Sequence, residues 1–168
     1  PVVILKIVGD GPESLPLRSR AVRAGVVERV IFDGRLDHDE AVGAIASAHA
    51  LVIASDTEGM PHTAIESLAC GTPLIAVPVG GVIDLIHDRV TGLRVTQDVD
   101  SLAAAFATLR DDPRLLESLQ QGAKVAGQAW AFGQCADQIE ALLREAAGPK
   151  PTAVFVGKSW LRGSSPED

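Results

Sequence analysis

Aromatic residues are scarce in this sequence, making up 4% of the chain, and tyrosine is absent. Proteins that bind single-stranded nucleic acid by stacking, or carbohydrate in the same way, depend on aromatic side chains. Basic residues are outnumbered as well, because 15 Lys and Arg face 22 Asp and Glu and leave a net charge of −7. Nucleic-acid-binding proteins usually carry a basic surface. The composition therefore argues against nucleic acid and anionic membrane surfaces as partners.

Cysteines and long apolar runs are few. Two cysteines, Cys70 and Cys135, are too few for a disulfide framework and suit a reducing compartment. No stretch approaches the roughly 18 uninterrupted apolar residues of a membrane span, and no charged-then-apolar leader precedes a cleavage site. We therefore expect a cytoplasmic protein with no intrinsic membrane segment.

Short β-branched apolar runs alternate with segments of helical character along most of the chain. This alternation predicts an α/β fold, a doubly wound parallel sheet with helices on both faces. The first run, 2–8, is typical of a strand buried on both faces. Strands are predicted over 2–8, 30–33, 50–54, 74–77 and 92–95, and helices over 14–24, 37–48, 61–70, 101–109, 113–130 and 134–147.

The 168 residues, 46% of them hydrophobic, suit one domain with a sizeable core. We assign residues 1–147 to that domain. From Gly148 onward the composition shifts to Gly, Pro, Lys and Ser, which indicates a tail over 148–168. Within the tail, 152–156 is equally compatible with an added strand and with an expression remnant.

Ligands of such sheets bind outside the carboxyl ends of the strands, which directs attention to the loops at 9–13, 33–37, 55–61 and 78–84. The third of these loops holds Glu58, and Glu66 follows eight positions later inside the next helix. Helical spacing leaves Glu66 on a flank of that helix. The residues expected to pack on the sheet are Ala64, Ile65, Leu68 and Ala69.

The amides of Met60 to Ala64 form the positive end of this helix, which is suited to a phosphate. A carboxylate on each side of a phosphate site suits a ligand with a diol at both ends of a diphosphate, because a carboxylate accepts hydrogen bonds from two hydroxyls. A nucleotide sugar is such a ligand. On spacing alone, an alternative is equally supported, in which Glu58 caps the helix and Glu66 is a solvated helix residue.

Two other patterns imitate ligand sites. The run Gly9-Asp10-Gly11 resembles the start of a dinucleotide-binding loop but lacks the third glycine, which disfavours that interpretation. The pair Asp98 and Asp100 imitates a metal-binding D-x-D motif, but Asp100 as the N-cap of the following helix is the preferred interpretation.

The cluster at 37–40 has the residue types of a metal site, but Asp37 with Glu40 three positions later favours a capping box. His62 is as compatible with a solvated surface residue as with a contact to a diphosphate. Cys70, at a helix end, is expected to be a small packed residue.

Six motifs in order resemble one known family. They are Val-Gly-Asp-Gly-Pro (8–12), Val-Ile-Phe-Asp-Gly-Arg-Leu (30–36), Ala-Leu-Val-Ile-Ala-Ser (50–55), Glu-Gly-Met-Pro-x4-Glu-Ser-Leu-Ala-Cys-Gly-Thr-Pro (58–73), Gly-Gly-Val-Ile-Asp-Leu-Ile (80–86) and Thr-Gly-Leu-Arg-Val (91–95). Together they resemble the C-terminal, donor-binding domain of retaining GT-B glycosyltransferases of group 1, the GT4 family. The resemblance covers about 2–147 and includes the E-x7-E signature at Glu58 and Glu66.

This resemblance implies roles for the two glutamates and for residues of the loops around them. Glu66 is expected to bind the ribose diol, and Glu58, the catalytic candidate, to contact the hydroxyls of the sugar. The 34–36 loop is expected to lie against the base. It implies no metal and no cofactor, because the helix end and side chains meet the diphosphate. The substrate-binding candidates are Glu66, Gly59, Met60, Pro61, His62, Thr63, Arg35, Leu36, Gly9 and Gly11.

The sequence also departs from the family pattern. It lacks the first strand and helix of the domain, with their Arg and Lys, and the N-terminal acceptor domain. Met60 stands where an aromatic is usual, and Asp84 where Glu is usual.

We therefore expect the donor-binding part of a retaining hexosyltransferase that uses a UDP-, GDP- or ADP-sugar, with the chain inactive by itself. Peripheral membrane association through the missing domain is compatible with this expectation. The alternatives are a sugar-nucleotide epimerase of GT-B fold and a non-catalytic nucleotide-binding or interaction module.

Overall fold

The computed structural model describes residues 2–130, 140–143 and 145. The chain divides into two compact units, Pro1–Ala131 and Phe132–Asp168. In the second unit the described residues 140–143 and 145 are helical, as predicted. The rest of the helix predicted over 134–147, and the strand considered over 152–156, lie outside the described residues.

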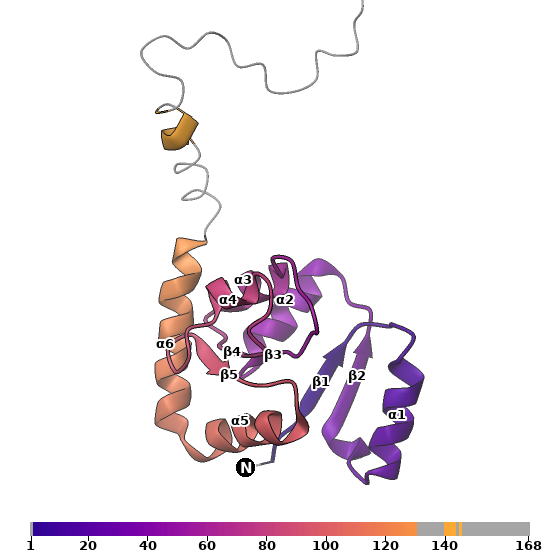
Figure 1. The fold of residues 1–168 in the computed structure, drawn as a ribbon. Helices are drawn as coiled ribbons and strands as arrows, with labels where there is room; N and C mark the ends of the chain where they lie inside the picture. Colours follow the sequence, from indigo (N-terminus) through magenta and orange to yellow (C-terminus); the bar gives the residue numbers. More distant parts are fainter. Residues whose placement is uncertain (1, 131–139, 144, 146–168) are drawn as a thin grey trace, which may run out of the picture. The chain divides into compact units, whose positions relative to one another are not determined.

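The first unit alternates strands and helices along the chain, as the hydrophobic pattern predicts (Figure 1). Its strands are β1 (Leu5–Val8), β2 (Val30–Gly34), β3 (Leu51–Ile53), β4 (Leu74–Ala76) and β5 (Gly92–Arg94). Its helices are α1 (Ser14–Arg23), α2 (His38–Ser47), α3 (His62–Cys70), α4 (Val82–Leu85), α5 (Val99–Asp111) and α6 (Pro113–Ala129), with a 3-10 turn, η1 (Val27–Arg29). Only the short elements α4 and η1 were not predicted.

All the strand pairs are parallel, which confirms the predicted α/β class. β1 pairs with β2, and β4 lies between β3 and β5. The described strands therefore form a two-stranded and a three-stranded sheet, because β1 and β3 are not hydrogen-bonded to each other (Figure 1). The carboxyl ends of parallel strands bring the following loops to one edge of each sheet.

The core lies around β4, the central strand of its sheet. Successive side chains of a strand point to opposite faces, so Leu74 and Ala76 join one buried cluster and Ile75 the other. The first cluster includes residues of α3 and α6, and the second includes residues of α5. Helices thus cover both faces of this sheet, as predicted.

The first strand does not have the burial that its apolar sequence predicts. Ile4 is 61% exposed, Leu5 40% and Val8 44%. Burial on both faces requires packed layers on each side, and a central strand also has a neighbour on each edge. In its sheet β1 pairs only with β2, and neither buried cluster includes one of its residues. The prediction of a strand buried on both faces is therefore wrong for β1.

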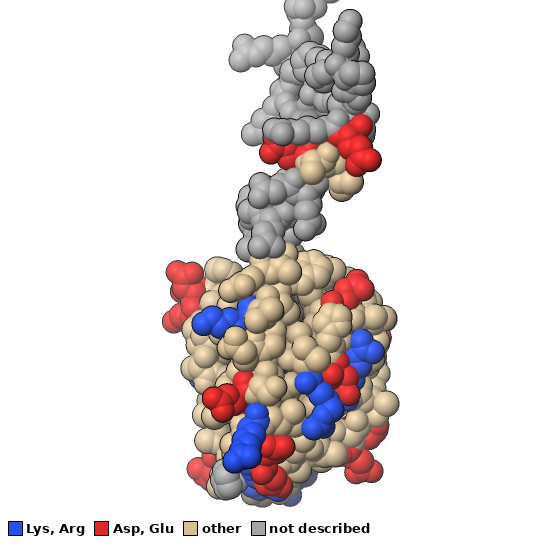
Figure 2. All heavy atoms as spheres, turned by 90° about the vertical axis from the view of Figure 1, so that its left-hand side faces the viewer, with Lys and Arg blue, Asp and Glu red and all other residues tan. Residues whose placement is uncertain are grey.

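On the face that Figure 2 presents, charge is mixed rather than segregated. Figure 2 shows Lys and Arg interspersed with Asp and Glu on the face that it presents. Mixed charge of this kind creates no strong field of one sign.

None of the helices among the described residues is both long enough and apolar enough to cross a membrane.

Candidate functional site

Helix α3 begins in the loop that follows β3 and presents its first turn beside Glu58. Its N-cap is Pro61, with no side-chain cap bond, and Gly71 ends it at a φ of 77°, a left-handed conformation that suits glycine. Glu58 therefore does not cap the helix, which removes that part of the alternative interpretation. The positive end of the helix keeps amides that its own side chains do not satisfy.

The free amides of this turn are fewer than the sequence suggested. Pro61 has no N–H, and the amide of Ala64 donates to the carbonyl of Pro61 over 3.1 Å. Among the described residues, no hydrogen-bond partner meets the amides of Met60, His62 and Thr63. These three remain available to an anion. Met60 itself is 41% exposed, and the side chain of His62 is exposed as well.

One residue of the buried face of α3 differs from the prediction. Ala64 and Leu68 are fully buried, as predicted, but Ala69 is exposed and Ser67 is buried in its place. The Ser67 hydroxyl donates to the carbonyl of Thr72 over 2.7 Å, which satisfies the polar group in the core. Because serine is polar, the hydrophobic pattern gives no signal for the burial of Ser67, and Ala69 was predicted instead.

A serine holds the side chain of Glu58. The Ser55 hydroxyl donates to Oε1 of Glu58 over 2.6 Å, and both residues are half-buried. A short bond to a carboxylate is among the stronger hydrogen bonds. Ser55 was not predicted as a site residue, although its place just after β3, three residues before the glutamate, was a usable signal.

The backbone that carries Glu58 rests directly on the loop after β4. The amide of Gly81 donates to the carbonyl of Gly59 over 2.6 Å. A Cβ atom added to Gly80 would lie 1.7 Å from the carbonyl oxygen of Glu58, and the φ of Gly80 is +51°. Glycine is required there by both the close approach and the left-handed backbone.

A third loop, after β5, also reaches the loop of Glu58. The side-chain amide of Gln97 donates to the carboxylate of Asp56 and, over 3.4 Å, to the carbonyl of Ala54. Nothing in the sequence pattern pointed to Gln97, because the contact joins residues 41 positions apart. The loops after β4 and β5 thus both contact the loop that carries Glu58, which follows β3.

Glu66 lies opposite helix α2 and is not a fully solvated helix residue. Its side chain is 27% exposed, and its Oε1 lies 3.8 Å from Nδ1 of His38, the first residue of α2. The capping box predicted at the start of α2 is present, with the amide of Glu40 donating to Asp37 over 2.8 Å. This confirms the capping interpretation of the 37–40 cluster and leaves His38 facing Glu66.

The loops after β1 and β2 are joined to each other. Arg35 lies 3.4 Å from the carboxylate of Asp10, and the amide of Gly9 donates to the carbonyl of Gly34 over 2.6 Å. Arg35 is exposed and Leu36 is half-buried. Gly9 and Gly11 line a hollow of about 270 Å³ beside α1, whose wall is largely apolar. The salt bridge partly neutralises Arg35, which is the basic residue among the predicted substrate-binding candidates apart from His62.

Asp98 rather than Asp100 is the N-cap of α5, so the predicted cap residue is wrong by two positions. Asp98 accepts bonds from the hydroxyl of Thr96 and from the amide of Ser101, and these bonds lower the pKa of its carboxyl. The helix starts at Val99, two residues earlier than predicted, which moves the cap accordingly. Within the described residues, no group of three His, Cys, Asp or Glu could hold a metal.

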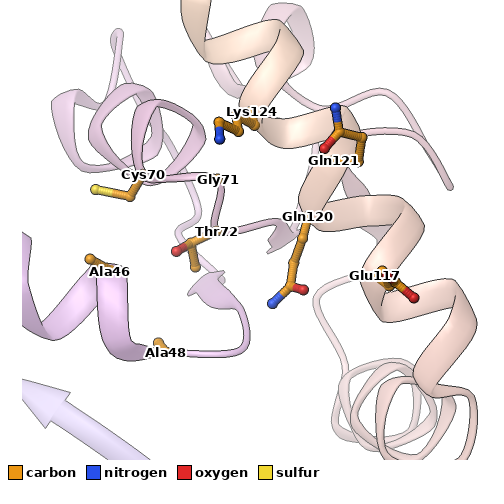
Figure 3. Close-up of a pocket in the computed structure, with 9 residues that line it drawn as sticks. All are labelled: Ala46, Ala48, Cys70, Gly71, Thr72, Glu117, Gln120, Gln121 and Lys124. Carbon is orange, nitrogen blue, oxygen red and sulfur yellow. The ribbon is translucent and has the colours of Figure 1, made fainter.

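A larger hollow lies at the other end of α3, away from the first turn. It measures about 440 Å³ and is open to solvent (Figure 3). Figure 3 shows Lys124 from α6 above Gly71, with Thr72 and Cys70 at the end of α3. Cys70 is half-buried. The hollow contains none of the residues that the sequence predicts for a ligand.

The comparisons with known proteins agree on one family. The family model described as glycosyl transferases group 1 matches residues 1–126. The chain belongs to this family. It is 34% identical over 140 residues to a GDP-mannose-dependent alpha-(1-6)-phosphatidylinositol monomannoside mannosyltransferase of Mycolicibacterium smegmatis, a match covering 79% of this chain and 36% of that protein.

Solved structures of glycosyltransferases share the fold. Sucrose-phosphate synthase from Thermosynechococcus elongatus superposes with a TM-score of 0.75 at 29% identity, covering 87% of this chain and 39% of that one. HepE from Anabaena, solved in complex with UDP, superposes with a TM-score of 0.74 at 25% identity, covering 84% of this chain and 40% of that one. The family and fold predicted from the six motifs are confirmed.

The group 1 family members that this chain matches are longer than it is. The chain spans 25% to 36% of the length of the curated relatives it matches. The match therefore concerns a part of each relative.

Proposed function

We propose that this chain is the donor-binding part of a retaining glycosyltransferase. It binds a UDP-, GDP- or ADP-sugar, and the hexose is transferred to an acceptor hydroxyl with retention at the anomeric carbon. The observation that carries the proposal is the pair of half-buried carboxylates, Glu58 and Glu66, before and after the first turn of α3. The free amides of that turn lie between them in the chain.

The chemistry of a nucleotide sugar matches this arrangement group by group. The diphosphate meets the free amides of Met60, His62 and Thr63, together with that of Gly59, at the positive end of the helix. Glu66 accepts hydrogen bonds from the ribose diol, and Glu58 accepts them from hydroxyls of the hexose. Pro61, the N-cap of α3, has no N–H and so adds no donor for the diphosphate.

The remaining candidates form the nucleoside end of the proposed site. Arg35, held by Asp10, and half-buried Leu36 lie in the loop proposed to face the base. Gly9 has a φ of +127°, and a Cβ on either Gly9 or Gly11 would meet nothing within 4 Å, so their loop leaves open space for a ligand. The hexose acceptor is expected to be bound by another domain of the enzyme.

Binding of plain and sugar-bearing nucleotides tests the assignment of the two glutamates. We expect Glu66→Ala to weaken both UDP and UDP-glucose, since ribose is common to both, and Glu58→Ala to weaken only UDP-glucose. Losing hydrogen bonds to a charged group costs about 1.5–3 kcal/mol. Ligand-observed NMR titration of the 168-residue chain measures these affinities, with the GDP and ADP pairs run in parallel.

A matched control removes an acidic side chain elsewhere. Glu117, exposed on α6 beside the distant hollow, has no part in the proposed site. Glu117→Ala is expected to leave every affinity unchanged. Equal losses for Glu58→Ala and Glu66→Ala with plain UDP would contradict the assignment. Binding of none of the six ligands by the wild-type chain would contradict donor binding itself.

A further inference from the structure

The loop of Glu58 is restrained at its backbone from two neighbouring loops. Gly80 and Gly81 lie against the peptides of Glu58 and Gly59, and Gln97 holds the carbonyl of Ala54. These contacts fix the path of the chain but not the torsions of a long glutamate side chain. A free glutamate loses substantial rotamer entropy when it is ordered by a ligand.

Ser55 supplies the restraint that the backbone contacts leave out. Its hydroxyl donates to Oε1 of Glu58 over 2.6 Å, and the bond is partly buried. Among the described residues, Glu58 makes no other side-chain hydrogen bond or ion pair. An ionised carboxylate has about four acceptor sites, so the serine occupies one and leaves the others for hydroxyls of a ligand.

We propose that Ser55 is a positioning residue that makes the site select nucleoside diphosphates carrying a hexose over nucleoside diphosphates without one. The inference rests on the proposed function and deepens it. By holding the Glu58 carboxylate in one orientation before the ligand arrives, Ser55 lowers the ordering cost of the contact with the sugar. A nucleoside diphosphate that carries no hexose does not use that carboxylate, and its affinity is unaffected.

The readout is therefore a ratio: the affinity for UDP-glucose divided by the affinity for UDP, or the matching GDP or ADP pair if that base binds better. We expect Ser55→Ala to lower this ratio about two- to tenfold, the size of the ordering cost of one flexible side chain. The affinity for the plain diphosphate stays within about twofold. Ser55→Thr keeps a hydroxyl and is expected to keep the wild-type ratio.

Two further variants keep the test decisive. Ser47, exposed on α2, donates to the carbonyl of Ala44, so Ser47→Ala removes a hydroxyl away from the site and should change nothing. If Ser55→Ala does not fold, Ser55→Cys, a near-isosteric weak donor, is expected to lower the ratio in the same direction.

Each outcome separates the inference from the proposed function. If the wild-type chain binds neither member of any pair, the proposed function fails. If the wild type prefers the sugar nucleotide and Ser55→Ala keeps the wild-type ratio, the inference fails while the proposed function stands. Equal losses of both ligands in Ser55→Ala, or a wild type without any preference for the sugar nucleotide, also overturn the inference.

Discussion

Substituting alanine for Gly80 tests whether the loop after β4 holds the loop of Glu58 in place. Two costs add at this position. The left-handed backbone, with a φ of +51°, costs a residue with a side chain about 1–2 kcal/mol. The new Cβ would also lie 1.7 Å from the carbonyl oxygen of Glu58, and overpacking of this kind costs about 1–3 kcal/mol.

Together these costs predict that Gly80→Ala lowers the free energy of unfolding by about 2–5 kcal/mol. For a chain of this size the melting temperature then falls by about 4–20 °C. The Glu58 peptide must also retreat by about 1.3 Å to bring the contact to 3.0 Å. Because misplacement of about 1 Å disrupts a preorganised site, we expect affinity for the sugar nucleotide to fall about tenfold or more.

Thermal unfolding followed by circular dichroism and the NMR titration described above measure the two effects. Gly43→Ala is the matched control, since Gly43 lies in α2 and a Cβ there would meet nothing within 4 Å. That substitution is expected to stabilise the chain by about 0.5–1 kcal/mol. If Gly80→Ala unfolds at the wild-type temperature and binds the sugar nucleotide normally, the reasoning about this contact is wrong.

Three further outcomes are expected. Donor binding should be weak, with a Kd of about 0.1–10 mM that rises with salt, because Arg35 is paired with Asp10 and the net charge is −7; calorimetry giving sub-micromolar, salt-independent binding would contradict this. The purified chain should not transfer sugar, since it spans 25% to 36% of its relatives and transfer needs an acceptor held beside the donor; product above background in a radiolabelled assay refutes it. Between about pH 5 and 2, Asp98→Asn should lose less stability than the wild type. The pKa of Asp98 is lowered in the folded chain, so its carboxylate stabilises the fold above the ordinary carboxyl pKa, and this stabilisation is lost as pH falls through the lowered pKa. Identical acid unfolding curves for the two chains would contradict this prediction.

Much of the fold could be predicted because it depends on local rules. Apolar runs of strand length alternating with helical segments predict parallel pairing, and the start at Pro61 and end at Gly71 mark the limits of α3. The capping box of Asp37 and Glu40 is likewise a local pattern and is present. The apolar runs, the helix limits and the capping box each depend on residues within a few positions of one another, so the sequence alone determines them.

The candidate site could be predicted only as a set of residues, not as an arrangement. The paired glutamates and the glycines stand out in the sequence, but their contacts join distant segments. His38 meets Glu66 across 28 positions, and Gln97 meets Asp56 across 41. No periodicity links such residues, because their proximity follows from how strands and helices pack.

Burial, too, was decided by the tertiary structure. The apolar run of β1 has the composition of an interior strand, yet Leu5 and Val8 are exposed, and neither buried cluster includes a residue of β1. Ser67 is buried where Ala69 was expected, and the carbonyl of Thr72 accepts the hydrogen bond that its hydroxyl donates. Sequence determines which residues can be buried or bonded, while the neighbours that packing supplies determine which of them are.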